Sequence, residues 1–208
     1  MELLERFVLG LAGKERPSVL YVPTATGDEA SRIEFFRERR PDASVLRLFW
    51  LADDLVDPRA LVLEHDVVVV GGGNTANMLA VWRVHGVDTA LREAWERGAV
   101  LTGASAGMIC WFECGVTDSF GALAPLHDGL GFLAGSACPH YDGEADRRPT
   151  YTRLVQDEAF PAGYAADEAA ALHFRGTELV ECVASAPGAS VYRVGPDGEV
   201  PLPTRVIA

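Results

Sequence analysis

Residues 98–111, which read GAVLTGASAGMICW, combine a short apolar run, a corner of small residues and a run able to form a helix. The apolar run ends at Gly103, and Ser105 follows between two alanines. Small residues are favoured at such a corner because a sharp turn crowds the backbone against neighbouring elements. The Gly-x-Ser-x-Gly pattern therefore predicts a strand–turn–helix corner of the nucleophile-elbow type, with Ser105 at its tip. The alternative interpretation is a packing corner in which Ser105 only caps a helix.

The bulk composition limits the class of protein. The chain has 208 residues, 49% of them hydrophobic, which suits an α/β fold that we expect to form a single domain over residues 1–208. The formal net charge of −12 argues against a nucleic-acid partner and against anionic membranes. No apolar run approaches the roughly 20 residues of a transmembrane helix, and the charged N-terminus is unlike a secretion signal. We therefore expect a cytoplasmic protein with reduced, mostly buried cysteines at positions 110, 114, 138 and 182.

Apolar periodicity along the chain predicts strands that alternate with helices, and hence a mostly parallel sheet with helices on both faces. The unbroken valines of residues 66–70 suit a central strand that is covered on both faces. We expect Ile33, Phe35 and Phe36 to face inward from a helix that ends near residue 40. The other expected helices cover residues 2–12, 76–84, 87–97 and 145–156. The other expected strands or short strand-like pieces cover 18–22, 44–50, 98–103, 116–120, 130–133, 136–141, 163–168, 169–174, 179–184 and 190–194, the last four as a β-ribbon.

The valine strand runs into a glycine-rich loop, GGGNT at residues 71–75. This loop and the Ser105 corner both follow strands, so both belong to the sheet edge where ligands bind in parallel α/β folds. A serine nucleophile needs oxyanion donors: the N–H of Ala106 is one candidate, and the loop glycines offer a second. A mobile turn and a phosphate loop are the alternatives, but the GxGxxG spacing and the Walker lysine are missing.

A serine nucleophile also needs a base, and the sequence has five histidines. His140 is our first choice because it lies where an apolar stretch breaks into a polar turn, after Pro139, which stiffens the backbone. Spatial neighbours need not be neighbours in sequence, so the residues alone leave this choice open. An α/β-hydrolase arrangement would instead use His173 with an acid such as Asp142.

Three motifs, GGGNT at 71–75, GASAG at 103–107 and PHY at 139–141, resemble in order and spacing those of peptidase E. This is the aspartyl dipeptidase family of serine peptidases (family S51), related to cyanophycinases. The resemblance covers nearly the whole chain. It implies a three-layer αβα sandwich, flavodoxin-like and similar to class I glutamine amidotransferases, with serine in place of the amidotransferase cysteine. Relatives place a strand before the first helix, whereas this sequence starts directly in that helix.

The resemblance also implies roles for individual residues. Ser105 would be the nucleophile and His140 the general base, with Gly72 and Ala106 as the oxyanion hole. Glu168 would be the acid that orients the base. Its neighbour Asp167 is the alternative, and only one of the two can reach His140 because successive strand side chains face opposite ways.

Recognition of an N-terminal aspartate needs a cation, and a guanidinium group suits a carboxylate best. Arg148 fits the family register, with Arg147 and Arg153 as alternatives. Asn74 and Asp118 are the other expected substrate-binding residues. Asp118 would hold the substrate's amino group or support the site, and the alternative is a carboxylate that caps a turn.

The sequence thus predicts a serine exopeptidase that acts on short peptides, chiefly dipeptides with N-terminal aspartate, and needs no metal or cofactor. The expected partner is a short peptide, and formation of a homodimer stays open. One alternative is a cyanophycinase-like hydrolase of β-Asp-Arg units, and another is a dipeptidase of broader specificity. An amidotransferase would need a cysteine where Ser105 stands, and a catalytically silent binding protein is the remaining alternative.

Overall fold

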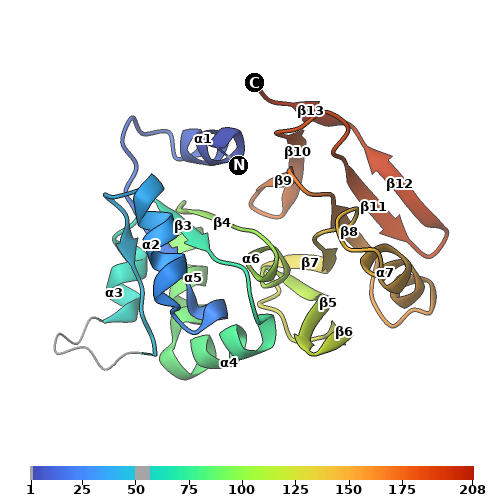
Figure 1. Cartoon of the computed structure of the whole chain (residues 1–208), viewed down its shortest axis with the longest axis horizontal. Helices are drawn as coiled ribbons and strands as arrows, with labels where there is room; N and C mark the ends of the chain where they lie inside the picture. The colour runs from blue at the N-terminus through green and yellow to red at the C-terminus, as the bar shows by residue number, and fades with distance from the viewer. Residues whose placement is uncertain (1, 50–56) are drawn as a thin grey trace. The chain divides into compact units, whose positions relative to one another are not determined.

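The structure, a computed structural model, describes residues 2–49 and 57–208 (Figure 1). By their contacts, these residues form two compact units. The N-terminal unit is Val8–Gly107, and the C-terminal unit joins Met1–Phe7 to Met108–Ala208. The expectation of one domain over the whole chain remains a prediction.

A parallel sheet with the strand order β2-β1-β3-β4 forms the centre of the N-terminal unit. Its strands are β1 (Val19–Val22), β2 (Ser44–Val45), β3 (Val67–Val70) and β4 (Val100–Gly103). Side chains of adjacent strand residues point to opposite faces, and both Val67 and Val68 of β3 are fully buried. The predicted central strand, covered on both faces, is therefore confirmed.

Helices lie around this sheet (Figure 1), and α1 and α2 pack against it through apolar side chains. The helices are α1 (Glu2–Leu11), the 3₁₀ helix η1 (Thr24–Thr26), α2 (Ala30–Arg39), α3 (Pro58–Leu63), α4 (Thr75–His85) and α5 (Val87–Glu96). Val8 of α1 and Phe36 of α2 pack with Val19 and Val67 of the strands. The sequence did not predict α3, although Asp57 caps it and Pro58 occupies its first position, a common start of a helix.

The expected inward face of α2 is partly wrong. Ile33 is buried, and the ring of Phe36 stacks on Tyr21 with a centroid distance of 4.1 Å. Phe35, in contrast, is 44% exposed and lies under the guanidinium of Arg39 at 3.7 Å. Residues three apart share a helix face, whereas residues two apart do not, so Phe35 cannot face inward together with Ile33.

Strand β2 is shorter than the predicted 44–50 because its pairing with β1 ends at Val45. The N–H groups of Leu48 and Phe49 donate instead to the carboxylate of Asp28. Trp50, the expected end of the strand, lies outside the described residues.

The C-terminal unit contains a mixed sheet, β12-β11-β8-β7-β5-β6, and a smaller sheet, β13-β10-β9. Strands β5, β7 and β8 run parallel to one another, and β6, β11 and β12 pair antiparallel with their neighbours. The elements are α6 (Ala106–Ile109), β5 (Phe112–Phe120), β6 (Ala122–Leu126), β7 (Leu133–Cys138), α7 (Arg147–Gln156), β8 (Gly163–Ala166), β9 (Ala170–Arg175), β10 (Glu178–Ala184), β11 (Val191–Gly195), β12 (Gly198–Leu202) and β13 (Thr204–Val206). The antiparallel pairs β9–β10 and β11–β12 correspond to the expected C-terminal β-ribbon.

Three strands, β6, β12 and β13, were not predicted, and the expected piece at 130–133 is mostly a loop. β6 and β12 are outer strands of their sheet and contain Pro125 and Pro201. Proline weakens a strand signal, but it is tolerated on an edge strand, where its missing N–H can face away from the ladder. In this loop the N–H of Leu130 donates to the carbonyl of Cys110, whereas Leu133 is already the first residue of β7 and pairs with Phe112 of β5.

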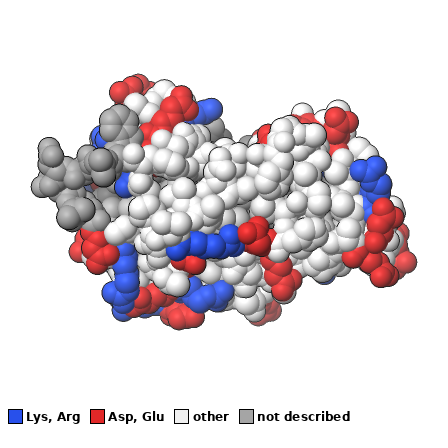
Figure 2. All heavy atoms as spheres, turned by 90° about the horizontal axis from the view of Figure 1, so that it is seen from below, with Lys and Arg blue, Asp and Glu red and all other residues white. Residues whose placement is uncertain are grey.

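The burial of the cysteines agrees with the expectation from composition. All four cysteines are buried and free, as predicted, and burial raises the pKa of Cys114 and Cys182 to about 11. On the face in Figure 2, the drawn Lys and Arg side chains stand as separate groups among acidic ones rather than as one basic area. None of the helices in the described part of the chain is long and apolar enough to cross a membrane.

Candidate active site

Ser105 lies at the corner between β4 and α6, as the sequence predicted. Its φ of 58° is in the left-handed region, which non-glycine residues adopt at a cost of about 1 kcal/mol or more. Strained backbone of this kind persists where the surrounding structure holds it, and it is common at functional sites. The conformation of Ser105 therefore favours the nucleophile elbow over an ordinary helix cap.

The glycines that flank this corner are required by close packing. A Cβ atom on Gly103 would lie 2.6 Å from the carbonyl oxygen of Val70, and one on Gly107 would lie 2.5 Å from the same oxygen. Both distances are far below van der Waals contact, and Val70 is in the buried strand β3. The predicted reason for small residues at the corner is thus confirmed.

The glycine-rich loop approaches the same corner within the N-terminal unit. A Cβ atom on Gly72 would lie 3.2 Å from Cβ and 3.8 Å from Oγ of Ser105. Gly73, at a φ of 134°, passes so close to Ala25 that a Cβ atom there would lie 2.4 Å from its carbonyl oxygen. The loop backbone can therefore approach Ser105 only because side chains are missing. The oxyanion role of Gly72 and Ala106 remains a prediction.

Asn74, expected to bind substrate, has a structural role in this loop. It is the N-cap of α4, and its Oδ1 accepts the N–H of Asn77 at 2.9 Å. Asn caps satisfy a backbone donor at the start of a helix and so fix where the helix begins. Asn74 therefore sets the geometry in which the glycine-rich loop enters α4.

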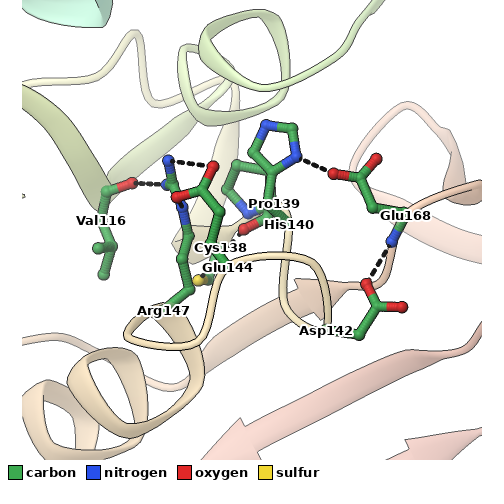
Figure 3. A network of polar contacts seen from close by, with 8 residues as sticks. All are labelled: Val116, Cys138, Pro139, His140, Asp142, Glu144, Arg147 and Glu168. Carbon is green, nitrogen blue, oxygen red and sulfur yellow. Dashed lines mark hydrogen bonds and ion pairs between the residues drawn. The ribbon is translucent and has the colours of Figure 1, made fainter.

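In the C-terminal unit, the imidazole of His140 and the carboxylate of Glu168 are joined by a hydrogen bond (Figure 3). Nδ1 of His140 contacts Oε1 of Glu168, so Nδ1–H donates to the carboxylate and Nε2 is left as the basic nitrogen. His140, like Ser105, has a left-handed backbone, with a φ of 56°. This arrangement is the one that a general base and its orienting acid require.

The alternative acid, Asp167, points elsewhere. Its Oδ2 accepts the N–H of Ser190 at 3.0 Å and the hydroxyl of Tyr192 at 3.4 Å. Asp167 is buried, and burial raises the pKa of its carboxyl against the opposing effect of the Ser190 bond. Glu168 is thus the one of the two carboxylates that contacts His140, and its role as the acid of a triad remains a prediction.

Arg148, expected to bind the substrate's carboxylate, already has an acidic partner. Its guanidinium pairs with Glu199 of β12 and lies 5.1 Å from the ring centroids of both Tyr141 and Tyr192. Burial alone would raise the pKa of Glu199, but the hydrogen bonds from Arg148 and Tyr141 lower it overall. A substrate carboxylate would therefore have to compete with Glu199 for this arginine.

The two alternative arginines differ from Arg148 and from each other. Arg147 is buried, pairs with Glu144 and donates to the carbonyl of Val116 at 3.0 Å (Figure 3). Arg153 is exposed in the last turn of α7. Arg147 therefore has a structural role: its hydrogen bond to Val116 connects α7 with β5.

Asp118, the last expected substrate-binding residue, is exposed on β5. Its carbonyl accepts the N–H of Gly121 at 2.9 Å and closes the turn into β6. This main-chain bond leaves the carboxylate's role in substrate binding as a prediction.

The His173–Asp142 pair that the α/β-hydrolase alternative requires is not formed by these two described residues. His173 on β9 contacts Glu181 at 3.5 Å, and the carboxylate of Asp142 accepts the N–H of Glu168 at 2.7 Å. The two residues that this arrangement requires therefore have different partners. Among the described residues, no group of three or more His, Cys, Asp or Glu side chains could hold a metal ion.

The chain is similar to known peptidases in sequence and in fold. Residues 1–182 match the profile of peptidase family S51. The chain is 45% identical over 210 residues to "Uncharacterized peptidase YgaJ" of Bacillus subtilis (strain 168), covering 98% of this chain and 91% of that protein. The crystal structure of a peptidase from an acI-B1 Actinobacterium is similar over 98% of this chain and 90% of that one, with a TM-score of 0.72 and 20% identity. A putative peptidase E from Listeria monocytogenes EGD-e is similar over 83% of this chain and 90% of that one, with a TM-score of 0.57 and 20% identity.

The sequence comparisons identify the chain as a serine-type peptidase. The chain belongs to peptidase family S51, as the three motifs predicted. The structural neighbours, at 20% identity, support the α/β fold with a parallel sheet and nothing finer.

Proposed function

We propose that the protein is a serine exopeptidase that hydrolyses short peptides, chiefly dipeptides with N-terminal aspartate. The observation that carries this proposal is the left-handed Ser105 at the glycine-lined corner after β4. Membership of a serine peptidase family supports the assignment of this serine as the nucleophile. The partner is a short peptide, and no metal or cofactor takes part in the proposed steps.

The proposed mechanism uses a Ser105–His140–Glu168 triad. Nε2 of His140 removes the proton of the Ser105 hydroxyl as Oγ attacks the scissile carbonyl carbon, and Glu168 stabilises the imidazolium that forms. The N–H groups of Gly72 and Ala106 donate to the oxyanion. His140 then protonates the leaving amine, and a water molecule, activated by the same histidine, releases the acyl group from Ser105. The His140–Glu168 pair supports the two later members of this triad.

A panel of dipeptides tests the proposal directly. Asp-Leu, Leu-Leu, Lys-Leu and β-linked Asp-Arg are incubated with the protein at one pH, and free amino acids are measured. We expect Asp-Leu to be the best substrate, and a fluorophosphonate probe to label Ser105 with loss of that activity. Cleavage of β-Asp-Arg alone would identify the cyanophycinase-like alternative. No cleavage together with no labelling would contradict a serine peptidase.

A dipeptidase of broader specificity is the second candidate, and the Arg148–Glu199 ion pair is the observation that favours it. The guanidinium of Arg148 already pairs with Glu199 and lies beside two tyrosine rings, so fewer of its N–H donors are free to bind a substrate carboxylate. In this case Asp-Leu and Leu-Leu would be cleaved with similar kcat/KM.

Variants of this ion pair separate the two candidates. If Arg148 binds the substrate's aspartate, Arg148→Ala should raise KM for Asp-Leu about tenfold and leave Leu-Leu unchanged, the size expected for one charged hydrogen bond. Glu199→Gln should then lower KM for Asp-Leu, because it releases the guanidinium. Arg37→Ala, an exposed arginine on α2, is the control. Equal changes for both dipeptides in Arg148→Ala would show that Arg148 does not distinguish aspartate.

A further inference from the structure

The turn that follows His140 contacts Glu168 a second time, through Asp142 (Figure 3). Oδ1 of Asp142 accepts the backbone N–H of Glu168 at 2.7 Å. The N–H of Tyr141 also donates to the carbonyl of Ala166 at 3.0 Å, so two hydrogen bonds join this turn to the end of β8. Sequence reasoning considered Asp142 only as the acid of a different triad and missed this role.

These contacts form a closed ring. From the imidazole of His140 the ring passes through the carboxylate and backbone N–H of Glu168 to the side chain of Asp142, and returns along the backbone to His140. The Glu168 side chain is 59% exposed, so packing alone does not hold it in one rotamer. A long, exposed side chain loses entropy when it is fixed, and a fixed backbone at its base reduces the number of conformations to be lost.

Gly143, in the same turn, provides the space in which the Glu168 side chain lies. A Cβ atom on Gly143 would lie 3.0 Å from Cγ and 3.1 Å from Oε1 of Glu168, the oxygen that contacts His140. A Cβ atom at position 143 would therefore require this carboxylate to shift by a few tenths of an ångström relative to the imidazole.

From these contacts we propose that Asp142 is a positioning residue, which fixes Glu168 so that its carboxylate holds His140 in one orientation. This inference rests on the proposed function, in which His140 is the general base. Orientation of a catalytic base to within a fraction of an ångström affects the rate of the chemical step more than substrate binding. Asp142 should therefore contribute to kcat and hardly to KM.

We propose that Asp142 acts through the hydrogen bond that its Oδ1 accepts from the Glu168 N–H, and not through its negative charge. Two other acidic side chains of this turn already have partners: Glu144 pairs with Arg147, and Asp142 accepts the backbone N–H of Glu168. A further negative charge is not needed to stabilise an imidazolium beside Glu168. An amide at position 142, which keeps Oδ1 as an acceptor, should replace the carboxylate.

The experiment compares Asp142→Ala, Asp142→Asn and Gly143→Ala with the control Asp146→Ala, an exposed residue whose side chain does not cap α7. The readouts are kcat and KM for the best dipeptide and the NMR resonance of the hydrogen-bonded His140 Nδ1–H. We expect Asp142→Ala and Gly143→Ala to lose this resonance and to lower kcat about tenfold, with KM within about twofold. Asp142→Asn and Asp146→Ala should match the wild type.

Two results would overturn the proposal: a wild-type Nδ1–H resonance and kcat in Asp142→Ala, or an Asp142→Asn variant as impaired as the alanine variant. Gly143→Ala keeps Asp142 in place, so it tests the position of Glu168 even where Asp142→Ala fails to fold. The resonance is measured without substrate. If the wild-type protein cleaves no peptide, the proposed function fails, while the resonance still decides whether Asp142 positions the pair.

Discussion

Replacing Ser105 by alanine should lower kcat/KM for the best short peptide by about 10⁴-fold or more, the loss seen when a serine peptidase loses its nucleophile. Without Oγ there is no acyl-enzyme, and neither His140 nor the oxyanion donors can supply one. The folded state should be unaffected, because alanine keeps the Cβ atom and the same left-handed backbone at a φ of 58°. The measurements are dipeptide turnover, labelling by a fluorophosphonate, and the melting temperature.

Two further variants separate the nucleophile from a packing corner. Ser31→Ala, at an exposed position of α2, should keep full activity and full labelling. Ser105→Gly should be as inactive as Ser105→Ala but more stable by about 1 kcal/mol, because glycine adopts the left-handed region without strain. Full turnover in Ser105→Ala would leave the strained corner without a catalytic purpose and would exclude this serine as the nucleophile.

Features that depend on local pattern could be predicted from the sequence. The valines of β3 predicted a strand buried on both faces, and both faces are covered. The Gly-Ala-Ser-Ala-Gly corner predicted a turn too tight for side chains at its ends, and Gly103 and Gly107 both pass against Val70. In both cases the residue type reflects a local requirement. β-Branched residues suit a buried strand, and glycine suits a corner without room for a side chain.

Features that depend on distant partners could not be predicted in this way. Glu199 lies 51 positions from Arg148, and no pattern near either residue indicates that they pair. Strand β12, which carries Glu199, contains Pro201 and was itself missed because proline resembles a turn signal. The role of Asp142 is similar: its acceptor reaches Glu168, 26 positions away, through a turn whose shape depends on the sheet. The proposed choice of substrate and the proposed orientation of the base therefore depend on long-range pairings, which are the hardest features to predict from sequence.

Replacing Gly107 by alanine should destabilise the protein by about 3 kcal/mol, the upper part of the range for overpacking a core. The added Cβ atom would lie 2.5 Å from the carbonyl oxygen and 3.0 Å from Cβ of Val70. The oxygen belongs to the backbone of a central strand that pairs on both sides with β1 and β4, so it cannot move aside cheaply. For a chain of this size the melting temperature should fall by roughly 10 °C, which calorimetry measures.

Gly10→Ala is the matched control, because a Cβ atom on Gly10 meets nothing within 4 Å and the residue lies inside α1. Alanine is the better helix former, so this variant should gain about 0.5–1 kcal/mol. The same chemical change thus has opposite expected signs at the two positions. Equal melting temperatures for the two variants would mean that the corner can open to accept a side chain. Ser105 would then not be held in its left-handed conformation by the packing of its neighbours, and the strain at the proposed nucleophile would need another cause.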